Sequence, residues 1–255
     1  MAMLQKLYRK NITAANINTV GLYIDDEWKY QKEPLPITQI PARSKNAVVI
    51  GNGISGHQFD LSIFLPYRET TDWGEIGPWK YKRQVNNFYT YGCNAIYRNF
   101  KPDFVVATGK DFINEIANST YCSENIVYTN LKYLEQYPNK FHAVPQNPEL
   151  NSGAIAAYLA AFDGHSKVFM LGFDGVDSNQ DNYIFYADTP NYPSRSSVIN
   201  EEYWVRSLNH IMTVYNDTEF IRVCPTRRFR QPEMWKYNLN YRQIDFRQFV
   251  LEAGV

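Results

Sequence analysis

The fold of this chain is decided by a stretch in which a buried strand runs directly into a glycine-rich turn, Val48-Val49-Ile50-Gly51-Asn52-Gly53-Ile54-Ser55-Gly56. Small residues at this spacing let backbone N–H groups and the start of a helix approach a phosphate. A tight strand-to-helix turn without a ligand would use the same spacing. We expect a nucleotide-type ligand on this turn.

On the C-terminal side of the turn, short apolar runs alternate with helical patterns at the spacing of βαβ units. We expect strands over residues 47–50, 88–91, 104–107, 126–129, 168–171 and 220–223. We expect helices over residues 55–65, 94–100, 111–117, 131–136, 152–162, 201–215 and 246–251. This alternation predicts an α/β domain over residues 46–255, with a doubly wound, mostly parallel, Rossmann-like sheet.

Residues 1–45 have a different pattern. The alternating segment 21–30 contains the pair Asp25-Asp26, which suits a tight turn between antiparallel strands, and prolines follow from Pro34 onward. We expect an N-terminal β-hairpin and linker that packs on the main domain or on another subunit. Together with abundant aromatic residues, this hairpin predicts a homo-oligomer.

Composition narrows the class of protein. The chain is 44% hydrophobic, 16% aromatic and 20% charged, with 26 basic and 26 acidic residues. A net charge of zero gives no global preference for nucleic acid or for an anionic membrane. Three scattered cysteines without CxxC spacing, and the absence of an apolar run of about 18 residues, predict a cytoplasmic protein without a membrane span.

Several common chemistries are disfavoured. A dinucleotide oxidoreductase needs a second strand ending in an acidic residue about 20 positions after the glycine turn, but residues 70–83 are expected to form a loop. The four histidines lack metal-site spacing, and the sequence contains neither a GxSxG elbow nor a P-loop lysine.

Two further segments suggest ligand contacts. Ser152-Gly153 precedes an alanine-rich helix, so Ser152 is a hydroxyl N-cap candidate and the helix N-terminus a second anion site. An ordinary capped core helix explains this segment equally well. The strand at 168–171 ends in Gly172-Phe173-Asp174, which makes Asp174 a candidate for contact with a ribose, a sugar or an amine.

The C-terminal region mixes basic and aromatic residues. They are Arg222, Arg227, Arg228, Arg230, Lys236, Arg242 and Arg247, with Trp235, Tyr237 and Tyr241. A nucleic-acid or anionic glycan acceptor would use such a surface, although a solvated basic face is the better interpretation.

In order along the chain, Gly51-Asn52-Gly53-Ile54-Ser55, Gly92-Cys93-Asn94, Ser152-Gly153, Leu171-Gly172-Phe173-Asp174 and Cys224-Pro225 resemble glycosyltransferase family 42, the bacterial sialyltransferases. They also resemble pterin diphosphokinase-like proteins and phage-encoded relatives. The resemblance implies nucleotide-sugar contacts at Gly51, Asn52, Gly53, Ser55, Asn94, Thr108, Ser152, Gly153, Gly172 and Phe173. It further implies that Tyr183 and Tyr186 hold the departing phosphate.

The sequence departs from the family at two positions. Ile54 replaces the proline of the family's GNGPS turn, a change that removes stiffness but no contact. The family's catalytic histidine would fall near Asn200, and asparagine cannot take a proton at neutral pH. The nearest ionisable group is Glu201.

We therefore predict a glycosyltransferase that uses a CMP- or UDP-linked sugar without a cofactor or a metal, with Asp174 or Glu201 as the catalytic base. The sequence shows no DxD motif at a strand end, in agreement with this. One alternative is magnesium-dependent diphosphate transfer to a pterin or nucleoside, with Asp174 and Asp177 as metal ligands. Another is a nucleotide-binding protein that has lost its base.

Overall fold

The computed structural model describes the backbone in thirteen ranges. These are residues 8–10, 17–24, 27–34, 46–64, 68–74, 77–83, 88–134, 136–137, 140–144, 148–174, 184–192, 201–226 and 230–254. Side chains are described within these ranges except before residue 46, in 68–83 and at 201–202.

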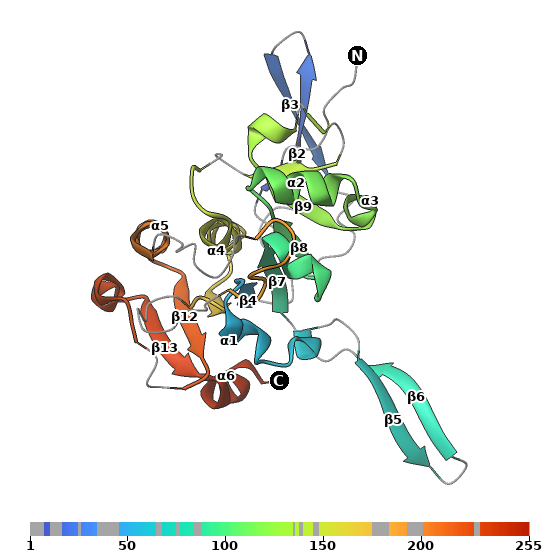
Figure 1. Cartoon of the computed structure of the whole chain (residues 1–255), viewed down its shortest axis with the longest axis vertical. Helices are drawn as coiled ribbons and strands as arrows, with labels where there is room; N and C mark the ends of the chain where they lie inside the picture. Colours follow the sequence, from blue (N-terminus) through green and yellow to red (C-terminus); the bar gives the residue numbers. More distant parts are fainter. Residues whose placement is uncertain are drawn as a thin grey trace.

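An eight-stranded parallel sheet lies at the centre of the main domain (Figure 1). Its strands, from one edge to the other, are β10 (His142–Ala143), β9 (Ile126–Thr129), β8 (Phe104–Val106), β7 (Phe88–Cys93), β4 (Asn46–Ile50), β11 (Lys167–Leu171), β12 (Glu219–Cys224) and β13 (Tyr241–Asp245). Every neighbouring pair is parallel. The predicted α/β fold class is confirmed.

The strand order reverses beside β4. The chain enters the sheet at β4, runs outward through β7, β8, β9 and β10, and then returns to β11 on the other side of β4. Ligands of open α/β sheets bind at such a reversal, outside the carboxyl ends of the strands. Because Ile50 pairs with Leu171, the turns after β4 and β11 emerge side by side.

Helices cover both faces of the sheet, because parallel strands are apolar on both sides. The α-helices are α1 (Ile54–His57), α2 (Lys110–Ala117), α3 (Tyr121–Glu124), α4 (Ser152–Phe162), α5 (Glu201–Val214) and α6 (Phe246–Ala253). The 3-10 helices are η1 (Leu61–Phe64), η2 (Asn94–Arg98), η3 (Leu131–Tyr133) and η4 (Glu233–Tyr237). Helices α4 and α5 pack on one face, whereas α2 and α6 pack on the other.

Some predicted elements differ from the structure. The helix expected over 55–65 stops at His57, and a 3-10 turn begins after Asp60, whose carboxylate accepts a hydrogen bond from the Ser62 N–H at 3.0 Å. The helices expected over 94–100 and 131–136 are the short 3-10 helices η2 and η3. Strand β13 was missed because an edge strand containing Arg242 and Gln243 has no continuous apolar run.

The predicted N-terminal hairpin is confirmed. Strands β2 (Ile17–Ile24) and β3 (Glu27–Pro34) pair antiparallel, and the Ile24 to Glu27 register leaves the two aspartates between them. A short strand, β1 (Tyr8–Lys10), adds to β2.

The loop expected over 70–83 is wrong. Strands β5 (Arg68–Gly74) and β6 (Gly77–Arg83) form an antiparallel hairpin that projects away from the main sheet (Figure 1). Threonine and aromatic residues favour this extended conformation. The hairpin adds no strand to the parallel sheet, so the segment still does not supply the second strand of a dinucleotide site.

Within the part of the chain that the structure describes, no helix is long and apolar enough to cross a membrane.

Candidate functional site

The glycine turn after β4 is hydrogen-bonded to the end of β11. The Gly51 N–H donates to the Leu171 carbonyl at 2.8 Å, and the Gly53 N–H donates to the Gly172 carbonyl at 2.9 Å. The Ser55 N–H donates to Asp174 Oδ2 at 2.7 Å. The neighbouring strand end therefore already occupies these three N–H groups, and nucleotide contact at the turn stays a prediction.

The glycines themselves are explained by the same close approach. A Cβ at Gly51 or at Gly53 would lie 2.5 Å from the Gly172 carbonyl oxygen. Gly172 has a φ of +70°, and a Cβ there would lie 2.7 Å from the Gly51 carbonyl oxygen. Two strand-ending turns thus pack backbone against backbone, and a ligand is not needed to account for the motif.

Asp174 stabilises the contact between the glycine turn and the end of β11. Its carboxylate accepts hydrogen bonds from the N–H and the hydroxyl of Ser55. Burial raises the pKa of Asp174, while the Ser55 hydrogen bonds and the charge of Arg222 act in the opposite direction. An ionised carboxylate offers about four acceptor positions, so Asp174 retains capacity for a further hydrogen bond.

The N-terminus of α4 brings together three of the residues expected to bind the nucleotide. The helix is capped by Asn151, whose side-chain oxygen accepts a hydrogen bond from the Ala154 N–H at 2.9 Å, so the N-cap is not Ser152 as expected. The Ser152 hydroxyl instead donates to Asn94 Oδ1 at 2.8 Å and lies 2.6 Å from the Thr108 hydroxyl. Residues from the ends of β7 and β8 and from the start of α4 therefore share one polar cluster.

Residues 184–192 lie against the glycine turn. The Phe185 N–H donates to the Asn52 carbonyl at 2.8 Å, and Ile184 forms an antiparallel bridge with Gly53. Tyr186 is 3% exposed, and its hydroxyl has no hydrogen-bond partner among the described residues. This places one of the two expected phosphate-holding tyrosines at the turn, whereas Tyr183 lies outside the described residues.

His57 contacts the same segment. Its ring stacks on Phe185 with centroids 3.7 Å apart and meets Tyr186 edge-on at 5.2 Å. Burial lowers the pKa of His57 to about 4, so the imidazole is neutral at pH 7. Glu201, the other candidate base, is the first residue of α5, but its side chain lies outside the described residues.

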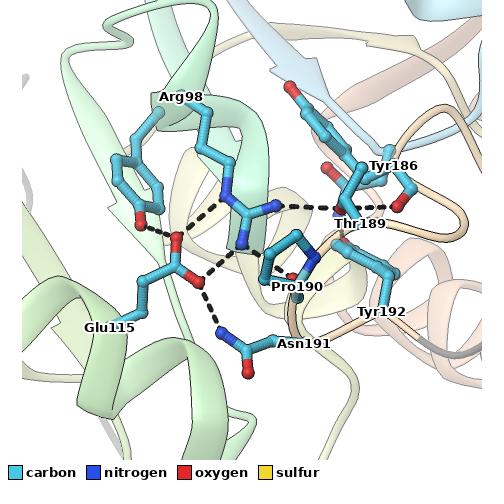
Figure 2. Close-up of polar contacts among 9 residues, drawn as sticks. Arg98, Glu115, Tyr186, Thr189, Pro190, Asn191 and Tyr192 are labelled. Atoms are coloured by element: carbon cyan, nitrogen blue, oxygen red, sulfur yellow. Dashed lines mark hydrogen bonds and ion pairs between the residues drawn. The ribbon is translucent and has the colours of Figure 1, made fainter.

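An arginine-centred network holds residues 184–192 in place (Figure 2). Arg98 forms a two-pronged ion pair with Glu115 and donates to the Thr189 hydroxyl at 3.0 Å and to the Pro190 carbonyl at 2.8 Å. Glu115 also accepts hydrogen bonds from Tyr97 and Asn191. Burial acts to raise the pKa of Glu115, but these hydrogen bonds outweigh it and lower the pKa.

Sequence reasoning missed this network and also missed Tyr192. Asn52 Nδ2 donates a hydrogen bond to the Tyr192 hydroxyl, across 140 positions of sequence. No local pattern marks Arg98, Glu115 or Tyr192, because the residues that they contact are distant in the chain.

The basic and aromatic residues of the C-terminal region are partly buried and partly exposed. Arg222 and Trp235 are buried, and the Arg222 guanidinium donates to the Phe173 carbonyl at 3.0 Å. Arg242 is paired with Glu219 and Glu252, and Lys236 with Glu233. Arg227 and Arg228 lie outside the described residues. Arg222, Trp235 and Tyr241 therefore do not contribute to a surface, whereas Arg230, Lys236, Tyr237 and Arg247 are exposed.

A metal cluster is not visible within the ranges that the structure describes, since no group of three or more His, Cys, Asp or Glu side chains converges there. Asp177, the second magnesium ligand of the diphosphate-transfer alternative, lies outside these ranges.

Comparison with known proteins gives a structural match without a sequence match. No family model matches the sequence, and no curated protein matches it. The monofunctional alpha-2,3-sialyltransferase Cst-I from Campylobacter jejuni superimposes with a TM-score of 0.50 at 16% identity, over 77% of this chain and 81% of that one. An alpha-2,3-sialyltransferase from Campylobacter jejuni in apo form gives a TM-score of 0.39 at 13% identity, over 71% and 76% of the two chains. The superposition on Cst-I shows that the chain has a sialyltransferase-like fold.

Proposed function

We propose that this chain is a glycosyltransferase whose nucleotide-sugar donor binds at the carboxyl ends of β4, β7, β8 and β11. The observation that carries the proposal is the cluster of Asn94, Thr108 and Ser152, three residues that the resemblance had selected together. They meet beside the reversal of strand order, where open α/β sheets hold ligands. The fold shared with the Campylobacter enzyme supports the same assignment.

The donor phosphate would lie at the N-terminus of α4. This helix has eleven residues and no acidic residue in its first turn, so its dipole favours an anion there. The glycine turn contributes less to phosphate binding than its sequence suggests, because its Gly51, Gly53 and Ser55 N–H groups are already used.

Transfer would proceed by attack of an acceptor hydroxyl on the anomeric carbon of the donor sugar. The new carbon–oxygen bond forms as the bond from that carbon to the phosphate oxygen breaks, and the phosphate keeps the electron pair. The acceptor proton passes to Asp174 or Glu201, and the unpartnered Tyr186 hydroxyl donates to the departing phosphate. These groups need no bound metal to act.

The test is a binding panel of CMP, CDP, UMP, UDP and their sugar conjugates, measured by thermal shift and calorimetry. We expect one pyrimidine nucleotide to bind. Ser152→Ala should weaken it about tenfold, because two hydrogen bonds of the cluster are lost. Ser207→Ala is the matched control, since Ser207 is an equally buried helical serine whose hydroxyl donates to the Tyr203 carbonyl.

Other outcomes would point elsewhere. If no pyrimidine compound is bound and none is hydrolysed, the proposal is refuted. ATP binding that requires magnesium would indicate diphosphate transfer instead. Tight nucleotide binding without turnover, unchanged in Glu201→Gln, would indicate a protein that only binds the nucleotide.

A further inference from the structure

Asn52 is the one residue of the GNG motif with a side chain, and its two amide ends have different surroundings. The Nδ2 end donates to the Tyr192 hydroxyl. The Oδ1 end is buried and has no hydrogen-bond partner among the described residues. An acceptor left in this state is unfavourable until a donor reaches it.

Tyr192 is well placed to hold the amide in one orientation. Its ring stacks on Tyr186 at 5.8 Å and packs against Phe112 at 4.8 Å. Burial raises the pKa of Tyr192, so its hydroxyl stays neutral, while hydrogen bonding from the Asn94 side chain and the Ala95 N–H acts to lower the pKa. One phenol thus contacts two of the asparagines expected to bind the nucleotide.

The position of Tyr192 is fixed by its chain neighbours. Arg98 donates hydrogen bonds to Thr189 and Pro190, and Asn191 donates one to Glu115 (Figure 2). The three residues before Tyr192 are therefore hydrogen-bonded to η2 and α2. The paired guanidinium and carboxylate groups have matching planar geometry, which lysine cannot reproduce.

We propose that Tyr192 is a positioning residue that holds the NH2 end of Asn52 and leaves Oδ1 for the ligand. This inference rests on the proposed nucleotide-sugar function. Because a carbonyl oxygen only accepts hydrogen bonds, Asn52 selects a ligand group that donates one, a hydroxyl or an amine, and does not bind a phosphate oxygen. Arg98 and Glu115 act on the same selection through Tyr192.

A first experiment needs no ligand. Tyr192→Phe removes one hydroxyl and keeps the ring, and hydrogen exchange is then followed in peptides that cover residues 51–58. We expect exchange there to become about fivefold faster, as one hydrogen bond to the turn is lost. Tyr121→Phe is the control, because Tyr121 is a buried tyrosine whose hydroxyl has no partner in the described structure. Equal exchange in wild type and Tyr192→Phe would overturn the proposal.

A second experiment tests selection with CMP, UMP and 2′,3′-dideoxy-CMP. In the wild type we expect a ligand that lacks the donating group to bind about fivefold or more weakly than CMP. Weaker binding of 2′,3′-dideoxy-CMP would identify the donor as a ribose hydroxyl, and weaker binding of UMP would identify it as the exocyclic amine. In Tyr192→Phe the amide can rotate, so this preference should shrink toward unity. Tighter CMP binding by Tyr192→Phe would show that Tyr192 blocks the site, and would overturn the proposal.

A double-mutant cycle separates the proposal from a general loss of structure. Arg98→Lys should weaken CMP binding in the wild-type background but have little further effect in Tyr192→Phe, because both changes act through one contact. Additive effects of the two substitutions would contradict the inference that Arg98 acts through Tyr192. A wild-type protein that binds no nucleotide would refute the proposed function, while the exchange experiment would still decide the role of Tyr192.

Discussion

The glycine turn after β4 and the N-terminus of α4 look alike in sequence, since each places a serine and a glycine at the start of a helix, yet they differ in how their N–H groups are used. At the glycine turn, the β11 end occupies the N–H groups of Gly51, Gly53 and Ser55. At α4, the contact seen within the described residues is the one from the Ala154 N–H to the side chain of Asn151, which caps the helix.

This difference teaches that a glycine-rich turn is not by itself a phosphate site. A glycine can be required because a ligand approaches, or because another part of the backbone does. In this protein the second reason accounts for the glycines of the turn, and the N-terminus of the eleven-residue α4 is the anion site that we propose.

The largest expected effect comes from adding a methyl group to each region. Gly53→Ala would place a Cβ 2.5 Å from the Gly172 oxygen and 2.7 Å from Asp174, whereas Gly153→Ala meets Phe173 at an ordinary 3.4 Å. We expect Gly53→Ala to destabilise the fold by about 3 kcal/mol, because neither backbone can retreat. Gly153→Ala should change stability by less than about 1 kcal/mol, since alanine also favours the helix. Denaturant unfolding measures both, and equal losses would contradict the comparison.

A smaller effect is expected from a charge at the α4 cap. Asn151→Asp keeps a good N-cap and adds a negative charge, so we expect unchanged or slightly raised stability. The same charge should repel a donor phosphate and weaken nucleotide binding about tenfold, measured by calorimetry. Asn118→Asp, at the exposed C-terminal end of α2, is the control for the added charge. Unchanged nucleotide affinity in Asn151→Asp would contradict the placement of the donor phosphate at the N-terminus of α4.

The smallest effect concerns the pH dependence of the glycine turn. Burial raises the pKa of Asp174 above the ordinary value of 3.8, so the folded state binds a proton more tightly than the unfolded state does. The resulting stabilisation is complete below pH 3.8 and is lost as pH rises through the folded pKa. We expect the wild type to lose stability relative to Asp174→Asn as pH rises across that window, measured by thermal unfolding at stepped pH. A wild type that gains stability relative to Asp174→Asn as pH rises would refute the assignment.

The sequence by itself determined the parts of the molecule that local patterns control. Strand β9 and helix α4 have the predicted bounds, because a short β-branched run and an alanine-rich helical run each carry their own signal. The hairpin β2–β3 was found from its alternation and turn residues, and the ends of β4 and β11 from the apolar runs before them, whereas β7 runs two residues beyond its expected end at Tyr91. The identity of Asn94, Thr108 and Ser152 as a set came from resemblance, and the structure brings them together.

Only the tertiary structure decided what those residues are available to do. The N–H groups of the glycine turn are taken by residues about 120 positions away, and Asn52 is held by Tyr192 at 140 positions. Arg222 and Trp235 look like a basic and aromatic surface in the sequence, but the addition of β13 at the sheet edge and of η4 beside α5 buries them. Hydrogen-bond capacity and burial depend on what packs against a segment, and that partner is chosen by the fold as a whole.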